Sequence, residues 1–248
     1  MNDRELFKRF AAISAIVAAP VALTSWVLLI LSVEGNLGLV EDMANVITLG
    51  APAAGYIHVA WMITDTFGYL LLLAPAAVYL LGWLKSRSPN LVQLATFFGF
   101  AYFVVGAIAV YLLAGMAPAM MRAHESASGA QQETLLLVFQ NAFNMAYYGV
   151  GPLGWFFGGL WWLGTGVVLW KERRIFGAAT VILGLLALVV WFEQAFHLQA
   201  LVIVETPFLF FIPIWSVWIG VVIWRREEKS ERLVEAAVAA RVFEGGTR

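Results

Sequence analysis

The sequence predicts an all-α polytopic membrane protein, a bundle of six transmembrane helices with short interfacial helices on its outer side. Three observations predict this fold. First, the 248 residues are 62% hydrophobic and 12% charged, whereas soluble domains are about 45–50% apolar and about 25% charged. Second, the apolar residues form six runs, each about as long as a helix that crosses a bilayer. Third, 14 of the 15 Lys and Arg residues lie in the two termini and in alternate connections between these runs.

Each run is expected to be a helix, because the backbone amides of a segment in hydrocarbon must be satisfied within that segment. The runs show none of the alternation of polar and apolar residues that marks the strands of a membrane barrel. The predicted spans are residues 10–33, 56–84, 91–116, 149–170, 175–204 and 208–224.

The distribution of Lys and Arg predicts the orientation of the chain. Basic residues occupy both tails and the second and fourth connections, and the odd-numbered connections hold only Arg122. Since basic residues in short loops stay in the cytoplasm, we expect both termini on the inner side of the cell (cytoplasmic) membrane. The first apolar stretch has about 20 residues, more than the roughly 7–15 of a signal peptide, so it is expected to be a retained span.

The inner connections and the C-terminal tail are short. Residues 85–90 and 171–174 are expected to join antiparallel neighbouring helices, because they leave no room for a longer path. Residues 225–248 carry apolar side chains at helical spacing among acids and bases, and they are predicted to form a cytoplasmic helical tail.

The outer connections are longer. Residues 34–55 are expected to hold a short interfacial helix, because Leu39, Met43 and Val46 recur at helical spacing. Residues 134–148 form either a second interfacial helix or an extension of the fourth span. A helix break is expected at residues 149–154, where Gly and Pro both weaken a helix.

Several classes of function lack their motifs. The chain has no Cys, which excludes disulfides, thiolate metal ligands and Cys nucleophiles. The basic groups are few and lie next to the spans, so the predicted partner is the lipid bilayer and not a nucleic acid. No phosphate-binding Gly-rich loop and no Gly-x-Ser-x-Gly nucleophile turn occurs. The prolines fall at unequal positions in the two halves, which argues against the inverted repeats of many transporters.

Polar side chains in and beside the spans are the candidate functional residues, because a charged group costs about 2.5–3.5 kcal/mol at a span centre on insertion scales. All of them are expected in the outer half of the bundle or at its outer surface. The set comprises His58, Asp65, Glu193, Gln194 and His197 within spans, Asn141 and Asn144 before the fourth span, and Glu205 before the sixth.

Spacing groups four of these residues. His58 and Asp65 are seven residues apart, and Glu193 and His197 are four apart, so each pair is expected on one helix face. If the two faces meet, two imidazoles and two carboxylates converge, with the two asparagines nearby. Such a set suits a proton-linked ligand pocket. No cofactor is predicted, although the same four residues are also weak candidate ligands for Zn or Fe.

Each of these residues also has a purely structural interpretation. His58 can lie at the level of the lipid headgroups. Asp65 can be a hydrogen-bonded carboxyl that links two helices. Glu193 and His197 can form an exposed pair within one helix end.

Small residues in the fourth span predict close helix packing. Gly154 and Gly158 form a small-xxx-small pattern, which Gly159 and Gly164 continue. The helix packed against them belongs either to the same chain or to a second copy in a homo-oligomer. The Trp residues of the fourth and sixth spans are interpreted as packing or lipid-facing residues and not as a cofactor site; they are Trp161, Trp162, Trp215 and Trp218.

Over residues 6–224 the order of parts resembles a family of six-helix bacterial membrane proteins classified only as a domain of unknown function. The similar segments are residues 7–10, 65–69 (DTFGY), 139–148, 158–164 (GGLWWLG) and 174–177 (RIFG). The resemblance implies the six-span architecture. It implies no activity and no catalytic residue.

Three classes of function remain. The first is a small-ligand-binding or permease-like protein whose ligand is unknown, with Asp65 exchanging protons. The alternative is a structural or accessory protein that acts through its packing faces or its tail. The second alternative is a metal-dependent membrane enzyme. An enzyme is the least favoured class, because a Glu-x-x-x-His spacing is a weak signal and the zinc-protease signature is absent.

Overall fold

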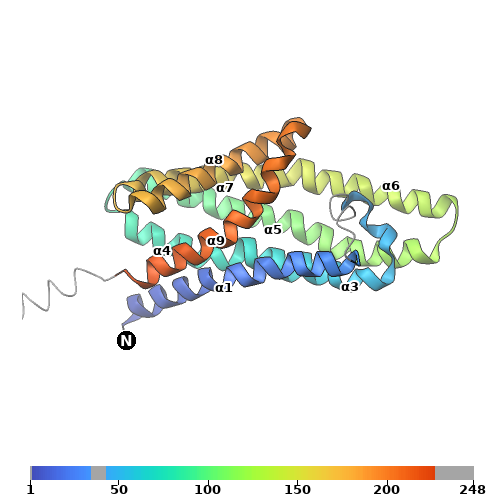
Figure 1. Ribbon diagram of the computed structural model, residues 1–248, viewed down its shortest axis with the longest axis horizontal. Helices are drawn as coiled ribbons and strands as arrows, with labels where there is room; N and C mark the ends of the chain where they lie inside the picture. Colours follow the sequence, from blue (N-terminus) through green and yellow to red (C-terminus); the bar gives the residue numbers. More distant parts are fainter. Residues whose placement is uncertain (1, 35–42, 227–248) are drawn as a thin grey trace, which may run out of the picture.

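The computed structural model describes residues 2–34 and 43–226, which are almost entirely helical. Short stretches of 3₁₀ and π helix, called η, interrupt or join the α-helices. Figure 1 labels the α-helices. In chain order the elements are α1 (Asp3–Ser32), η1 (Met43–Leu49), α3 (Ala51–Val59), η2 (Ala60–Leu70), η3 (Leu71–Leu73), α4 (Ala74–Leu84), α5 (Pro89–Ser126), α6 (Ala130–Asn144), η4 (Met145–Val150), α7 (Gly151–Trp170), α8 (Arg174–Phe196), η5 (Gln199–Val204) and α9 (Glu205–Trp224).

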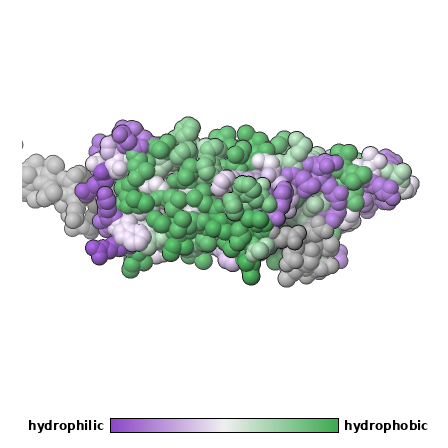
Figure 2. All heavy atoms as spheres, turned by 90° about the horizontal axis from the view of Figure 1, so that it is seen from above, coloured by the Kyte–Doolittle hydropathy of each residue, from purple (hydrophilic) through white to green (hydrophobic). Residues whose placement is uncertain are grey.

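The protein is a multi-pass membrane protein of the predicted class. Within the described ranges, six helical segments are long and apolar enough to cross a membrane. Figure 2 shows a band of hydrophobic surface around the middle of the molecule and hydrophilic surface at both ends, which matches a lipid-facing girdle. The segments are Asp3–Ser32, Ala51–Leu84, Pro89–Ser126, Ala130–Trp170, Arg174–Phe196 and Ala200–Trp224.

The two ends of the bundle differ in charge. The N-terminus and the end of α9 lie at the same end, as an even number of spans requires (Figure 1). The α4–α5 and α7–α8 turns, which carry Arg87 and Lys171, also lie there. We call it the basic end and the opposite end the distal end. The helix α9 crosses the bundle between them, from α1 at the basic end toward the end of α8.

Proline begins several helices. Pro52, Pro75, Pro89 and Pro152 lie in the first turns of α3, α4, α5 and α7. A first-turn residue needs no intrahelical amide partner, and the ring of proline already holds the helical φ. The N-terminus of α1 is capped instead by Asn2, whose side chain accepts the backbone N–H of Glu5 at 2.8 Å.

The predicted close packing of the fourth span occurs within the chain. A Cβ on Gly159 would approach Leu188 of α8 to 2.6 Å, and one on Gly164 would approach Ala95 of α5 to 2.7 Å. One on Gly158 would approach Tyr102 of α5 to 3.0 Å. Gly154 differs, because a Cβ there would meet Gly106 only at an ordinary 3.7 Å. Three of the four glycines are therefore used for helix contacts inside one chain.

The aromatic residues of this region form the centre of the main core. Trp161, Trp162 and Trp215 are at most 1% exposed, which confirms that they are packing residues. Trp215 donates its indole N–H to the Thr180 hydroxyl on α8 at 2.9 Å. The ring of Tyr102 lies 5.2 Å from that of Trp162, so α5, α7, α8 and α9 meet in one aromatic core.

Two helices are much longer than predicted. The helix α5 has 38 residues and the continuous run Ala130–Trp170 has 41. At about 1.5 Å per residue these are about 57 Å and about 61 Å long, roughly twice the ~30 Å hydrocarbon thickness. The α5–α6 hairpin therefore projects from the distal end. The predicted break at residues 149–154 is wrong, because the π-helical η4 leads directly into α7 and Pro152 lies in its first turn.

Residues 134–148 are thus an extension of the fourth span, one of the two expected alternatives. The short element η1 takes the place of the expected interfacial helix between the first two spans, and Val46 and Ile47 are buried in a second, distal core. Leu39 and the predicted helical tail beyond Arg226 lie outside the described residues.

The fifth span ends earlier than predicted. The helix α8 stops at Phe196 and not at residue 204, because His197 adopts a left-handed conformation with φ 54°. The chain then continues in the 3₁₀ helix η5, which leads into α9. Glu193 consequently lies in the last turn of α8, directly opposite the start of the next span.

Candidate functional site

The four residues expected to converge lie in separate places. The Nδ1 atom of His58 lies 3.0 Å from the carbonyl oxygen of Ala114 on α5. Asp65 instead contacts the hydroxyl of Ser25 on α1. Glu193 and His197 lie at the end of α8, which packs chiefly on α7 and not on η2. The predicted site shared by all four is therefore not formed.

The π-helical geometry of η2 explains why His58 and Asp65 face different neighbours. In a π-helix each amide bonds to the carbonyl five residues earlier, so a turn holds more than the 3.6 residues of an α-helix. The hydroxyl of Thr66 follows the same spacing and donates to the Trp61 carbonyl at 3.0 Å. A seven-residue spacing consequently does not return Asp65 to the face of His58.

Asp65 lies at the contact between η2 and α1. Its partner Ser25 also approaches the Ala60 carbonyl, at 3.5 Å. Beside it, Trp26 donates its indole N–H to the Tyr69 hydroxyl at 3.1 Å. This is the expected alternative in which Asp65 links two helices, with a serine as the partner.

The weak metal candidates do not form a ligand set. Across residues 2–34 and 43–226, no three His, Asp or Glu side chains are grouped so that they could hold one metal ion. Asn141 and Asn144 are exposed on α6, and within the same ranges neither hydrogen-bonds to another predicted pocket residue. His197 is exposed as well, and its ring packs against Tyr148 at 5.0 Å.

A different polar group lies where α8, α9 and η4 meet near the distal end. We call Tyr147, Glu193, Gln194 and Glu205 the distal polar cluster. Glu205 Oε1 accepts two hydrogen bonds, one from the Tyr147 hydroxyl and one from Gln194 Nε2 at 3.1 Å. Glu193 lies close enough to Glu205 and Tyr147 to interact with both electrostatically. The cluster therefore joins three helical elements through polar side chains.

Two oxygen atoms of this cluster are buried without a hydrogen-bond partner. They are Oε2 of Glu193 and Oε1 of Gln194, whose side chains belong to residues only 5% and 1% exposed. More than nine in ten buried polar groups in folded proteins have a partner. An unpaired buried acceptor costs about 1–3 kcal/mol, and more when it is charged. The other such atom in the described part of the chain is Trp162 Nε1 in the aromatic core, so these two are distinguished by lying together in one polar cluster.

The helix ends explain how the cluster forms. The left-handed His197 ends α8 three residues after Gln194, and η5 turns the chain so that Glu205 begins α9 beside Glu193 and Gln194. The continuous helix through η4 brings Tyr147 to the same place. A Cβ on Gly151, the first residue of α7, would lie 3.9 Å from Gln194 Oε1, so this backbone approaches the unpaired atom.

Sequence reasoning found only part of this cluster. It singled out Glu193 as a pocket residue, and it noted Gln194 as a polar residue within the fifth span and Glu205 as one before the sixth. It missed Tyr147, because a tyrosine at a span boundary is typical of the aromatic belts at membrane interfaces. The Tyr147-Tyr148 pair next to the Gly- and Pro-containing segment was the available signal.

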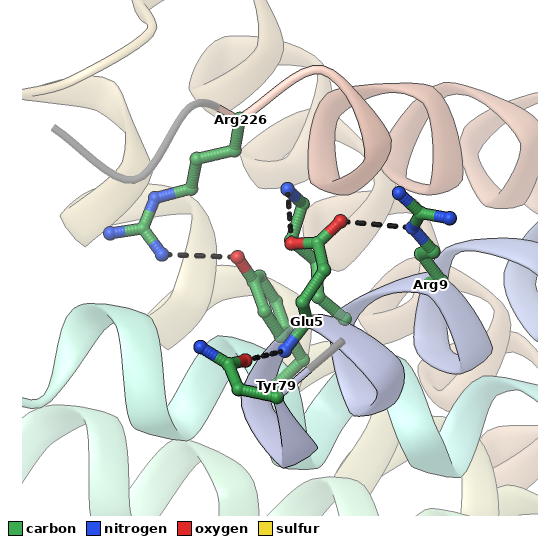
Figure 3. Close-up of polar contacts among 6 residues, drawn as sticks. Glu5, Arg9, Tyr79 and Arg226 are labelled. Atoms are coloured by element: carbon green, nitrogen blue, oxygen red, sulfur yellow. Dashed lines mark hydrogen bonds and ion pairs between the residues drawn. The ribbon is translucent and has the colours of Figure 1, made fainter. Parts of the chain in front are cut away.

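The basic end is held by a separate polar network that is fully paired. Arg226 donates to the Tyr79 hydroxyl at 3.1 Å, while Glu5 pairs with Arg9 at 2.9 Å (Figure 3). The guanidinium of Arg226 also lies 4.4 Å from the Trp83 ring. Trp83 in turn donates to Glu172 in the α7–α8 turn at 3.0 Å. These contacts join the ends of the helices and leave their acceptors occupied.

Two shallow surface hollows are apolar and lie elsewhere. One of about 380 Å³ is lined by Leu28 and Tyr56 among others, and one of about 360 Å³ lies between α5 and α7 around Phe98. Neither includes a residue of the distal polar cluster.

Comparisons with models of protein families, with curated proteins and with solved structures found no match.

Proposed function

We propose that this protein is a small-ligand-binding, permease-like protein of the cytoplasmic membrane, and that its ligand site is the distal polar cluster. In this proposal the distal end faces the outside of the cell. Its orientation is supported by the gathering of Lys and Arg at the basic end, because such residues stay on the cytoplasmic side.

The observation that carries the proposal is the pair of unpaired oxygens on Glu193 and Gln194. The carboxylate of Glu172 at the basic end differs, because Trp83 and Arg87 donate to both of its oxygens. Groups held without partners are typical of sites that a ligand completes, since their cost is recovered on binding.

Two other classes have less support. The structural class relied on glycines that could pack against a helix of a second protein. Gly159 and Gly164 instead pack against helices of the same chain. The metal-dependent enzyme relied on His58, Asp65 and the α8 pair meeting, and they do not meet.

The stability of a variant tests the proposal without knowledge of the ligand. Replacing Glu193 by Met keeps a buried side chain of similar length and removes the unpaired charge. We expect Glu193→Met to raise the free energy of unfolding by about 1–3 kcal/mol in mixed detergent micelles, the usual cost of an unpaired buried acceptor. A residue kept for function and not for stability gives such a gain.

Glu172→Met is the matched control, because Glu172 is a carboxylate with two partners at the basic end. It should lower the free energy of unfolding or leave it unchanged. A free energy of unfolding of Glu193→Met that is lowered or unchanged, as in the control, would show that Glu193 is structural, and the proposal would fail.

A further inference from the structure

The charge balance of the distal polar cluster limits what can bind there. Glu193 and Glu205 lie within electrostatic reach of each other, and Tyr147, Tyr148 and His197 are the other titratable groups that act on them. In the described part of the chain, the ion pairs of Lys and Arg all lie at the basic end. No ion pair to Lys or Arg is therefore present at the cluster in the described ranges, and His197 is the basic group that acts on Glu193. Two carboxylates this close repel each other in a low dielectric.

The hydrogen-bond balance gives a second limit. The donors of the cluster, the Tyr147 hydroxyl and Gln194 Nε2, are already directed at Glu205. The atoms left over, Glu193 Oε2 and Gln194 Oε1, are both acceptors. A ligand that completes the cluster must therefore bring hydrogen-bond donors, and an anion would meet only acceptors and negative charge.

Aromatic rings form the exposed side of the cluster. The Tyr148 ring lies 5.0 Å from the Tyr147 ring and 5.0 Å from the His197 ring. Phe143 stacks on Tyr147, with ring centroids 5.3 Å apart. Tyr148 is 38% exposed, so part of this group is accessible from outside the protein. The faces of such rings attract cations.

We propose that the ligand of the distal polar cluster is a small organic ammonium compound, whose N–H groups donate to Glu193 Oε2 and Gln194 Oε1 and whose charge balances Glu193 and Glu205. The identification of the ligand class rests on the proposed function. One ligand supplies what both limits demand, a positive charge and at least two donors. Its organic part lies toward the exposed rings of Tyr148 and His197.

Binding to the purified full-length protein in detergent tests the ligand class by isothermal titration calorimetry. The probes are methylammonium, tetramethylammonium, sodium and acetate, each as a salt with a non-interacting counterion. We expect methylammonium to bind, and tetramethylammonium to bind about tenfold more weakly or not at all, because it has the charge but no N–H donor. Acetate should not bind.

Variants locate the binding. Glu193→Gln keeps the shape of the side chain and removes its charge, and it should weaken methylammonium binding by about tenfold or more. Glu133→Gln changes an exposed carboxylate on α6 and serves as the matched control with unchanged binding. If Glu193→Gln does not fold, Tyr148→Leu at the exposed ring is the second variant, and it should also weaken binding.

Each contrary result has a distinct meaning. Equal binding of sodium and methylammonium would show a site for a bare cation and overturn the ammonium proposal. Equal binding of tetramethylammonium would remove the role of the N–H donors. Absence of methylammonium binding would overturn the ligand class, while the proposed function would still be decided separately by the stability of Glu193→Met.

Discussion

Glu205 at the start of α9 accepts a hydrogen bond from the side-chain amide of Gln194 near the end of α8, at 3.1 Å. The bond joins two successive spans across the turn formed by His197 and η5. It also aligns the amide so that its oxygen is left free while its nitrogen is used. One side chain thus both links two helices and presents an unpaired acceptor.

The hydroxyl of Tyr147 is expected to stabilise the same junction. Tyr147→Phe removes only this donor to Glu205, so we expect it to lower the free energy of unfolding by about 1.5–3 kcal/mol, as for a hydrogen bond to a charged group. Tyr111→Phe on the exposed surface of α5 is the control and should have little effect. Equal values for the two variants in reversible unfolding experiments would contradict this assignment.

The contact between α7 and α8 predicts a strong effect of one small substitution. A Cβ on Gly177 would lie 2.3 Å from the backbone nitrogen of Trp170, which cannot move without displacing the helix. Gly177→Ala should therefore destabilise the protein by about 1–3 kcal/mol through overpacking. Gly82→Ala, at a helical position with nothing within 4 Å, should be neutral or stabilising. Thermal unfolding of both variants, compared side by side, distinguishes packing from helix propensity.

Glu125 is expected to hold the distal core together. Its carboxylate accepts the backbone N–H of Ala51 at 2.6 Å, where Gly50 has a φ of 76° at the start of α3. Glu125→Ala should cost about 0.5–2 kcal/mol, as for the loss of an N-terminal cap. Glu125→Gln keeps an acceptor oxygen and should recover part of that loss. No difference between the two variants in unfolding free energy would argue against a capping role.

The orientation of the chain can be read from single cysteines, because the natural chain has none. Ser128→Cys places a thiol in the exposed α5–α6 turn, and Ser86→Cys places one in the exposed α4–α5 turn. A maleimide that cannot cross membranes should label the first variant in intact cells and the second only after the membrane is opened. The reverse pattern would invert the proposed topology.

The number of spans was predictable because hydrocarbon leaves the backbone no partner outside the segment, so long apolar runs must be helices. The ends of the helices were less predictable. Pro152 and its neighbouring glycines predicted a helix break, yet the helix continues through this segment by way of the π-helical η4. His197 ends α8 in a left-handed conformation that no local pattern indicates, since histidine is not a usual C-cap residue.

The candidate site was predictable in its residue types but not in its grouping. A helical spacing assigns His58 and Asp65 to one face only if the helix keeps 3.6 residues per turn, and η2 does not. Glu193 was recognised because a carboxylate in a span is costly. Its partners come from three elements whose junction depends on the unpredicted helix ends, so only the structure brings Tyr147 and Glu205 to it.

The α5–α6 hairpin is a projecting, rigid segment to which a second protein could be bound for imaging. Both of its helices continue without a break into the spans below, so a binding protein attached at the Gly129 turn would share the orientation of the whole bundle. An antibody fragment selected against the hairpin would then add mass and a recognisable shape without touching the proposed ligand site. That makes the hairpin the natural place to attach a fiducial for imaging single particles.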